Sequence, residues 1–276
     1  MITPVTETVI NEQSGVLESY DAHIKGENLW IVLDFLRNRC YSDIEAAVLR
    51  EYATNAQDIH NRHGITKPIQ ISLPCVLDSF LKIRDFGPAL ENKKLGDLFL
   101  SYGESDKRTS NLETGSLGLG CKCGFAYGDS FLVNAYRNGI MSIWNAYIDP
   151  SKKGKFDRLH EMPTTEPDGI EVVIPIKDND IASFRDKAMR IYAYFGITPN
   201  ITNIKPEEQI ILDSIKNPKV AFAGKGWRYI GNRGASIAVM ANVAYALSMK
   251  SFTDAEVAPE LKKLVDGGLI IDFENG

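Results

Sequence analysis

Residues 42–64 read SDIEAAVLREYATNAQDIHNRHG and predict one long helix, which decides the fold class. Ser42 and Glu45 have the spacing of a capping box, and Gly64 is placed to end the helix. On a helical wheel, one arc of apolar side chains forms the expected core face: Ile44, Val48, Tyr52, Ala56 and Ile59. The opposite face is expected to hold Ala46, Arg50, Ala53, Gln57 and Asn61.

Three polar residues of this helix, Glu51, Asn55 and Asp58, fall within roughly 60° of one another and overlap one edge of the apolar arc. Buried polar groups are costly unless they are paired or bind something. Glu51 and Asn55 are four residues apart, so both side chains can reach one site. A carboxylate can orient or deprotonate a water, and an amide oxygen is a hard ligand suited to Mg²⁺. The cluster indicates either a ligand site or an internal hydrogen-bond network without a ligand.

An aspartate follows the second of two strand-like runs, which cover residues 69–76 and 80–84. The second run ends in Asp85-Phe86-Gly87-Pro88, a turn sequence. A carboxylate leaving a strand into a tight turn is fixed in direction, so it can accept a hydrogen bond from an exocyclic amine such as that of adenine. The alternative is ordinary turn chemistry, in which Asp-x-Gly is common.

A glycine-rich segment, GSLGLGCK at residues 115–122, precedes the helix-like CGFAYG. Glycines at these spacings allow backbone amides to turn toward an anion, and a helix start adds its positive dipole end. Lys122 would bring a positive charge to a phosphate. The spacing excludes the Rossmann fingerprint and the P-loop, because neither pattern is present.

The rest of the chain predicts a mixture of helices and mostly antiparallel strands. Residues 93–100 indicate a short helix, and the polar stretch 101–120 indicates a lid or binding loop. Asn138-Gly139 predicts a hairpin turn between strands at 131–136 and 140–148, and residues 170–176 alternate as a further strand. Elsewhere we expect helices at 26–39, 180–195 and 255–265, a linker at 199–206, and strands within 220–247 and at 269–273.

This pattern predicts an α/β fold, namely a two-layer sandwich with helices on one face of a mixed, mostly antiparallel sheet. Residues 1–178 would form this domain, and residues 179–276 a smaller, transducer-like α+β unit. Because the chain stops just after an apolar strand, we expect the second unit to be truncated.

Composition limits the class of protein. The 276 residues are 44% hydrophobic and 24% charged, with a net charge of −5, so neither disorder nor a strong attraction to nucleic acid or anionic lipid is expected. The sequence shows neither a run of about 18 apolar residues nor a secretory signal, which predicts a cytoplasmic protein. The four cysteines, Cys40, Cys75, Cys121 and Cys123, lack metal-site spacing and are expected to be reduced thiols.

The order of the motifs resembles the GHKL superfamily, which includes gyrase-type topoisomerases, large heat-shock chaperones, histidine kinases and MutL. REYATNAQD resembles the N box, IRDFGPAL the adenine-binding box, and GSLGLGCK the lid hinge and phosphate box. The resemblance implies a Bergerat fold that uses ATP and Mg²⁺. It implies that Glu51 is the general base, Asn55 the Mg²⁺ ligand and Asp85 the adenine reader. Further nucleotide-binding positions that it implies are Asp58, Gly87, Ala89, Gly115, Gly118, Leu119, Gly120 and Lys122.

Two positions depart from the family pattern. Ala89 stands where a second glycine is usual, and Ile170 follows Gly169 where a threonine is usual. The first change restricts the backbone near the base, and the second removes a hydroxyl that often helps to hold a water at the adenine site. Both leave nucleotide binding in place and favour slow hydrolysis.

A longer set of residues, REYATNAQDIH, IRDFGPAL and GSLGLGCKCGFAYGDSF, resembles the N-terminal region of phage rIIA-type lysis-inhibition proteins. The resemblance covers about residues 25–176. It implies a protein of the host cytoplasm that acts in lysis control or defence evasion, with a phage or host protein as partner. A homodimer formed through the N-terminal segment or through a region beyond residue 276 is a further expectation.

Two functions therefore remain open. The first is ATP binding with slow Mg²⁺-dependent hydrolysis, used as a conformational switch. The second is a nucleotide-binding regulator without significant hydrolysis, which Ala89 and Ile170 favour. A histidine kinase is not expected because no phospho-acceptor helix or membrane segment precedes the domain, and a topoisomerase is not expected because the chain lacks a basic stripe.

Overall fold

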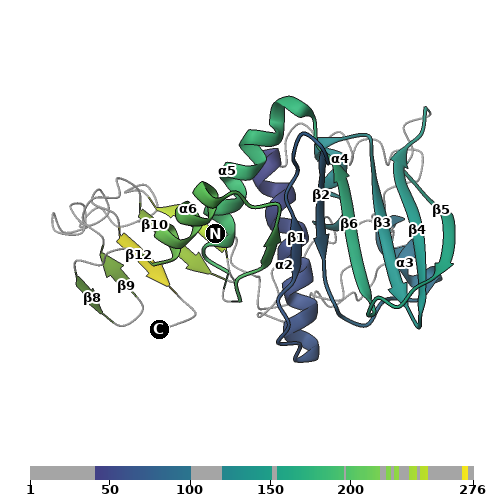
Figure 1. Cartoon of the computed structure of the whole chain (residues 1–276), viewed down its shortest axis with the longest axis horizontal. Coiled ribbons are helices and arrows are strands. Elements are labelled where there is room, and N and C mark those ends of the chain that lie inside the picture. The colour runs from purple at the N-terminus through teal and green to yellow at the C-terminus, as the bar shows by residue number, and fades with distance from the viewer. Residues whose placement is uncertain are drawn as a thin grey trace, which may run out of the picture.

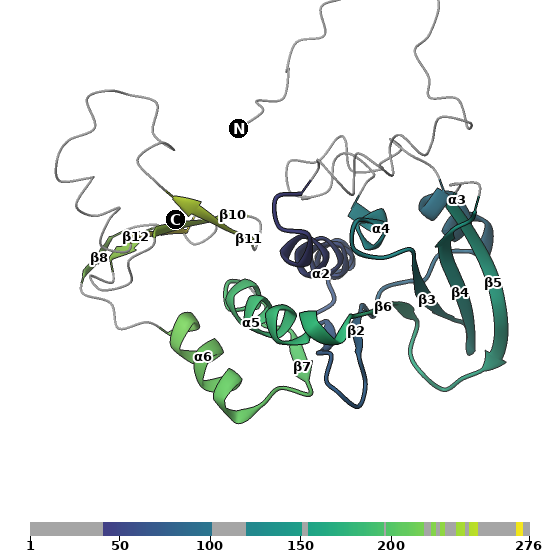
Figure 2. The same cartoon turned by 90° about the horizontal axis from the view of Figure 1, so that it is seen from above.

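The computed structural model describes residues 41–100, 120–150, 154–195 and 197–217, and the strand segments 222–224, 227–229, 236–240, 243–247 and 269–272. Figure 1 shows a seven-stranded sheet packed against helices, and a second, five-stranded sheet. The first sheet and its helices form the predicted two-layer α/β sandwich, with α2 and α4 on one side of the sheet (Figure 2).

The long helix α2 (Ile44–His63) begins and ends close to the predicted residues, but its N-terminal cap differs. The N-cap is Asp43, whose carboxylate accepts a hydrogen bond from Ala46 N at 3.1 Å. Glu45 pairs instead with Lys187 of a later helix at 3.0 Å, so the predicted Ser42–Glu45 capping box is wrong. Gly64 follows the helix with φ 63°, which confirms the predicted stop.

The first sheet has the strand order β5-β4-β3-β6-β2-β1-β7. Its strands are β1 (Gln70–Ser72), β2 (Phe80–Arg84), β3 (Ser130–Arg137), β4 (Ile140–Ile148), β5 (Gly154–Pro163), β6 (Gly169–Pro175) and β7 (Asn200–Thr202). All neighbouring strands are antiparallel except β1 and β7, which are parallel. Strand β2 lies between β1 and β6, so the chain leaves the interior of the sheet where β2 ends.

The predicted hairpin between β3 and β4 is confirmed. Asn138 and Gly139 have φ angles of 52° and 76°, and two positive φ values are the signature of a type I′ turn. Strand β5, which pairs with β4, was not predicted from the sequence. Phe156 is its one buried residue, so the strand lacks the alternation that marks a half-buried strand.

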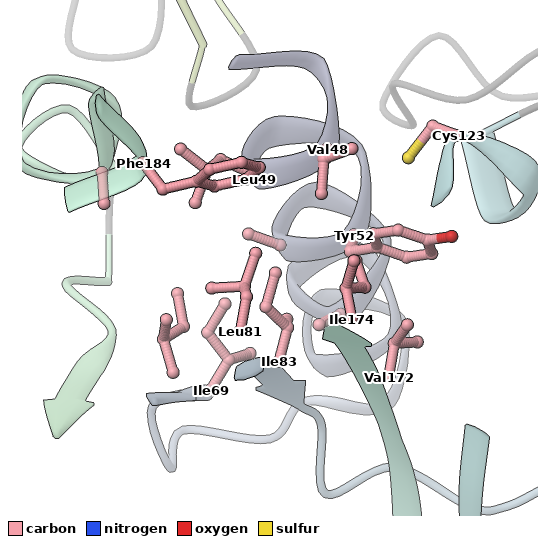
Figure 3. Close-up of a cluster of buried hydrophobic side chains, with 14 of the residues drawn as sticks. Val48, Leu49, Tyr52, Ile69, Leu81, Ile83, Cys123, Val172, Ile174 and Phe184 are labelled. Atoms are coloured by element: carbon pink, nitrogen blue, oxygen red, sulfur yellow. The ribbon is translucent and has the colours of Figure 1, made fainter. Parts of the chain in front are cut away.

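The core lies between α2 and the sheet (Figure 3). Buried side chains of the helix face those of the two central strands, among them Val48, Leu49, Tyr52, Leu81, Ile83, Val172 and Ile174. Ala53 and Gln57, which were expected on the outer face, are also buried. Helix α5 (Ile181–Tyr192) packs against α2, and its Tyr192 donates a hydrogen bond to Leu49 O at 3.1 Å.

Helix α5 is tied to α6 (Pro206–Lys216) and to the β1–β2 hairpin by one buried arginine. Arg185 pairs with Glu208 at 2.6 Å and donates hydrogen bonds to Pro74 O at 2.8 Å and Asn203 O at 2.6 Å. Residues 199–206 are therefore not a linker as expected, because they contribute β7 to the first sheet. Helix α6 was not predicted, and Leu212 is its one buried residue.

The second sheet has the order β11-β10-β12-β9-β8. Its strands are β8 (Phe222–Gly224), β9 (Trp227–Tyr229), β10 (Ser236–Met240), β11 (Val243–Leu247) and β12 (Leu269–Asp272). Strand β12 confirms the strand expected near the end of the chain, and it pairs in parallel with β10. The helices expected at 26–39 and 255–265 lie outside the described residues, and the division into two domains at residue 178 stays a prediction.

Candidate functional site

Helix α2 carries the polar cluster beside the end of the central strand. Glu51 and Asn55 are partly exposed, whereas Asp58 is 5% exposed and counts as buried. The helix contacts β2, the short 3₁₀ helix η3 (Gly120–Lys122) and helix α4 (Gly124–Tyr127). The structure thus brings α2, the end of β2 and the described end of the glycine-rich segment together, and it leaves Glu51 and Asn55 with access to solvent.

Asp85, the first residue after β2, is held in one orientation by backbone amides. Its Oδ1 atom accepts hydrogen bonds from Gly87 N at 2.9 Å and from Ile170 N at 3.3 Å. Asp85 N in turn donates to Ile170 O at 3.0 Å, which extends the pairing of β2 with β6 to this residue. Within the described ranges no donor reaches Oδ2, so this oxygen can accept a hydrogen bond from a ligand.

The carboxyl group of Asp85 is 9% exposed, and this burial dominates its acidity. Burial raises the pKa of Asp85 to about 6, although the amide hydrogen bonds of Gly87 and Ile170 and the charge of Arg84 act in the opposite direction. Buried carboxyl groups with a raised pKa cluster at functional sites. Asp85 is therefore a candidate functional residue.

Two glycines allow the Asp85 turn to approach its neighbours closely. A Cβ atom at Gly169 would lie 2.2 Å from Asp85 O, and Gly169 has a φ of 152°, which side chains rarely adopt. A Cβ atom at Gly87 would lie 2.1 Å from Cγ2 of Ile59 on α2. Gly87 is therefore required by packing against the helix, in addition to any role beside a ligand. Ala89, two residues further on, is partly buried in the segment that leads to α3 (Asn92–Leu100).

His60 contacts the same turn, and sequence reasoning missed it. This residue is 0% exposed in the last turn of α2, and its Nε2 atom accepts a hydrogen bond from Phe86 N at 2.8 Å. Lys67, from the segment between α2 and β1, places its ammonium 3.3 Å from the centre of the Phe86 ring. No local pattern marks His60, because its partner lies 26 residues away.

The end of the glycine-rich segment is fastened to α2. Tyr52 donates a hydrogen bond to Cys121 O at 3.0 Å and accepts one from Gly124 N at 3.0 Å. Lys122 is 0% exposed, and its Nζ lies 3.3 Å from Cys121 Sγ. The helix that carries Glu51 therefore also fixes the segment that carries Lys122.

The remaining sequence-predicted positions are Gly115, Gly118 and Leu119, which lie outside the described residues, as does the lid expected at 101–120 apart from its last residue. Gly120 is the first residue of η3.

Cys123, beside the site, is one of three free cysteines in the described part of the chain, and it is the buried one. Burial raises the pKa of Cys123 well above its ordinary value, which makes its thiol unreactive. Among the described residues, no group of three or more His, Cys, Asp or Glu side chains is arranged to hold a metal ion. A metal at this site would need oxygen ligands from a bound molecule in addition to those of the protein. The helices of the described ranges include none that is both long and apolar enough to cross a membrane.

Comparison with known proteins identifies the fold. A scan against protein-family models gives no match, and a search of curated proteins gives none either. Among solved structures, the chain is similar to the ATPase region of Saccharomyces cerevisiae topoisomerase II, with a TM-score of 0.55 and 14% identity. The similarity covers 82% of this chain and 71% of that chain. The predicted two-layer α/β sandwich is therefore confirmed as a fold similar to that of this ATPase region, whereas the resemblances to the GHKL superfamily and to phage rIIA-type proteins stay predictions.

Proposed function

We propose that this GHKL-type α/β sandwich binds ATP beside α2, the end of β2 and η3, and hydrolyses it slowly as a conformational switch. One observation carries the proposal. Asp85 is a buried carboxyl whose Oδ1 is oriented by two backbone amides, while Oδ2 has no donor among the described residues. An exocyclic amine such as that of adenine would supply this donor. The fold likeness to a solved ATPase region supports the same conclusion.

The phosphate end of the nucleotide would lie toward η3. Tyr52 bonds to Cys121 and Gly124 on either side of Lys122, and the Lys122 ammonium would bring a positive charge to the phosphates. Asn55 would bind Mg²⁺ through its amide oxygen, a ligand that suits this ion. Mg²⁺ is commonly held by one or two protein groups together with substrate phosphates, so Asn55 and the phosphates would share the ion. When bound, the ion would supply charge neutralisation at the phosphate oxygens.

Glu51 would act as the general base. It lies one helical turn from Asn55 and is partly exposed, so its carboxylate can accept a proton from a water at the phosphate end. Ala89 and Ile170 favour the second candidate function, a nucleotide-binding regulator that scarcely hydrolyses. The Ile170 amide orients Asp85, but its side chain offers no hydroxyl at this position.

The biological setting is a further part of the proposal. On the resemblance of its motifs, the chain would act in the host cytoplasm in phage lysis control or defence evasion. A phage or host protein would be its partner, and a second copy of the chain would form a homodimer with it.

A calorimetric titration with ATP and ADP, with and without Mg²⁺, tests the binding proposal. We expect saturable binding of both nucleotides and tighter ATP binding when Mg²⁺ is present. A chain that is folded but takes up neither nucleotide would overturn the proposal.

A phosphate-release assay on Glu51→Ala separates the two candidate functions. The variant should bind ATP as the wild type does and lose about 10²–10⁴-fold in hydrolysis rate, because the proton acceptor is removed. Asp186→Ala removes an exposed carboxylate of α5 and should leave the rate unchanged. If the wild type binds ATP but releases no phosphate that depends on Glu51, the regulator is the correct function.

A further inference from the structure

We propose that His60 is a positioning residue of this site, which holds the turn at residues 85–87 so that the Asp85 carboxylate faces the nucleotide base, and that it does so only as a neutral imidazole. The inference rests on the proposed nucleotide binding and assigns a role to a residue for which the sequence motifs gave none. It also predicts that acidification weakens binding through a group other than Asp85.

The hydrogen bonds around the turn place His60 at its centre. Phe86 N donates to His60 Nε2 at 2.8 Å, and the next amide, Gly87 N, donates to Asp85 Oδ1 at 2.9 Å. The amide of Phe86 belongs to the peptide group that also contains the carbonyl of Asp85. The side chain of α2 therefore fixes the peptide that directly follows the base-reading residue, and a rotation of this peptide would change the direction of the carboxylate.

The direction of this hydrogen bond sets the protonation state of the ring. Because Nε2 accepts, it carries no proton, and the neutral tautomer has its proton on Nδ1. In the described part of the chain no group meets hydrogen-bond geometry with the buried Nδ1, although the nearby Lys67 carbonyl favours the protonated ring. A phenylalanine would fill similar space without leaving a buried polar atom unpaired, so the Nε2 acceptor is the chemical feature that distinguishes His60.

Burial lowers the pKa of His60 below its ordinary value of 6.5, and the charge of Lys67 acts in the same direction, whereas the Lys67 carbonyl opposes both. Arg84 of β2 lies 5.2 Å from the centre of the Phe86 ring and adds positive charge on that side. A protonated ring would present an Nε2–H donor to the N–H of Phe86, and the hydrogen bond would be lost. At pH values above the lowered pKa of His60, the ring should hold the turn through this hydrogen bond. As the pH falls through that pKa, the turn should be released.

Two substitutions separate the acceptor from the bulk of the ring. His60→Gln keeps an acceptor near the position of Nε2 but does not titrate, and His60→Leu keeps an apolar volume without an acceptor. At pH 8, where Asp85 is charged, we expect His60→Leu to bind ADP roughly 3- to 10-fold more weakly than wild type, and His60→Gln to restore most of this loss. Equal weakening in both variants would overturn the proposal, because it would show that only the ring volume matters.

The pH dependence gives a readout that a packing role would not change. Asp85 titrates in both wild type and His60→Gln, so the ratio of their ADP affinities isolates His60. The affinity of wild type divided by that of His60→Gln should decrease as the pH is lowered from 8 to about 5.5. The reason is that only wild type has a histidine at this position that gains a proton. A constant ratio contradicts the requirement for a neutral ring.

Hydrogen exchange at the Phe86 amide tests the contact without any nucleotide. We expect exchange to be roughly 3- to 10-fold faster in His60→Leu than in wild type, with His60→Gln close to wild type and unchanged exchange in β3 and β4. If wild type binds no nucleotide, the proposed function fails while this contact can still be confirmed. If the Phe86 amide exchanges equally in all three proteins, the positioning role fails while nucleotide binding can stand.

Discussion

At the scale of single residues, the carboxyl of Asp85 lowers the stability of the protein at neutral pH. Its folded pKa of about 6 exceeds the ordinary value of 3.8, so the folded chain holds this proton more tightly than the unfolded chain does. The resulting penalty is absent below about pH 4, grows as the pH rises toward about 6, and is complete above that. The rise in the pKa of Asp85 from 3.8 to about 6 corresponds to a penalty of about 3 kcal/mol at most. A carboxyl group that destabilises the folded protein suggests a role in binding a ligand.

Asp85→Asn should therefore raise the free energy of unfolding. The amide oxygen of asparagine can still accept the hydrogen bonds from Gly87 N and Ile170 N, and it carries no charge to bury. Urea unfolding should show a gain of up to about 3 kcal/mol at pH 7.5 that shrinks toward zero near pH 4. A gain that does not change with pH would contradict the assigned cause.

Gly169 should tolerate no side chain, because a Cβ atom there would meet the backbone oxygen of Asp85 at 2.2 Å. We expect Gly169→Ala to cost roughly 2–4 kcal/mol in unfolding free energy. Gly64→Ala is the matched control, since Gly64 has φ 63° with no atom within 4 Å of the added Cβ, and it should cost about 1–2 kcal/mol. Equal costs, measured by denaturant unfolding, would mean that φ alone matters at Gly169.

At the scale of elements, the sequence predicts those helices and strands whose signals are local. Helix α2 has a stop glycine at Gly64, and the β3–β4 hairpin has Asn138-Gly139. Strand β5 and helix α6 were not predicted, because each buries one side chain and so has little periodicity. Helix α5, which packs against α2, begins over a hundred residues later, so its cover leaves no local signal in the sequence of α2. The role of His60 was equally out of reach, because it depends on a contact formed only in the folded chain.

The buried pair of Arg185 and Glu208 should be a strong link between α5, α6 and the β1–β2 hairpin. Their side chains are 5% and 13% exposed, so removal of one partner leaves a poorly solvated charge. Arg185→Ala should lower the free energy of unfolding by about 3–5 kcal/mol.

An exposed pair on the same helix provides the control for this substitution. Arg190 and Asp186 are 65% and 52% exposed, so Arg190→Ala should change stability by less than about 1 kcal/mol. Similar losses from the two arginines in thermal or denaturant unfolding would show that burial does not govern the Arg185 pair.

At the scale of the whole molecule, the candidate site is assembled from segments that are far apart in the sequence. Helix α2, the end of β2, the start of β6 and η3 meet on one side of the first sheet. The order of the motifs was enough to predict this meeting, because the resemblance fixes their arrangement in a known fold. It was not enough to predict the completion of the sheet by β7 or the cover that α5 gives to α2.

The most direct test of nucleotide binding at Asp85 is a calorimetric titration of Asp85→Asn with ADP at pH 7.5, beside its unfolding curve. We predict changes of opposite sign: the variant should be more stable than wild type and bind ADP about 10- to 100-fold more weakly, since it loses a hydrogen bond to a charged acceptor. Asp186→Asn, an exposed control, should change neither quantity. A stable Asp85→Asn protein that binds ADP as tightly as wild type would contradict the assignment of this residue and of the site built around it.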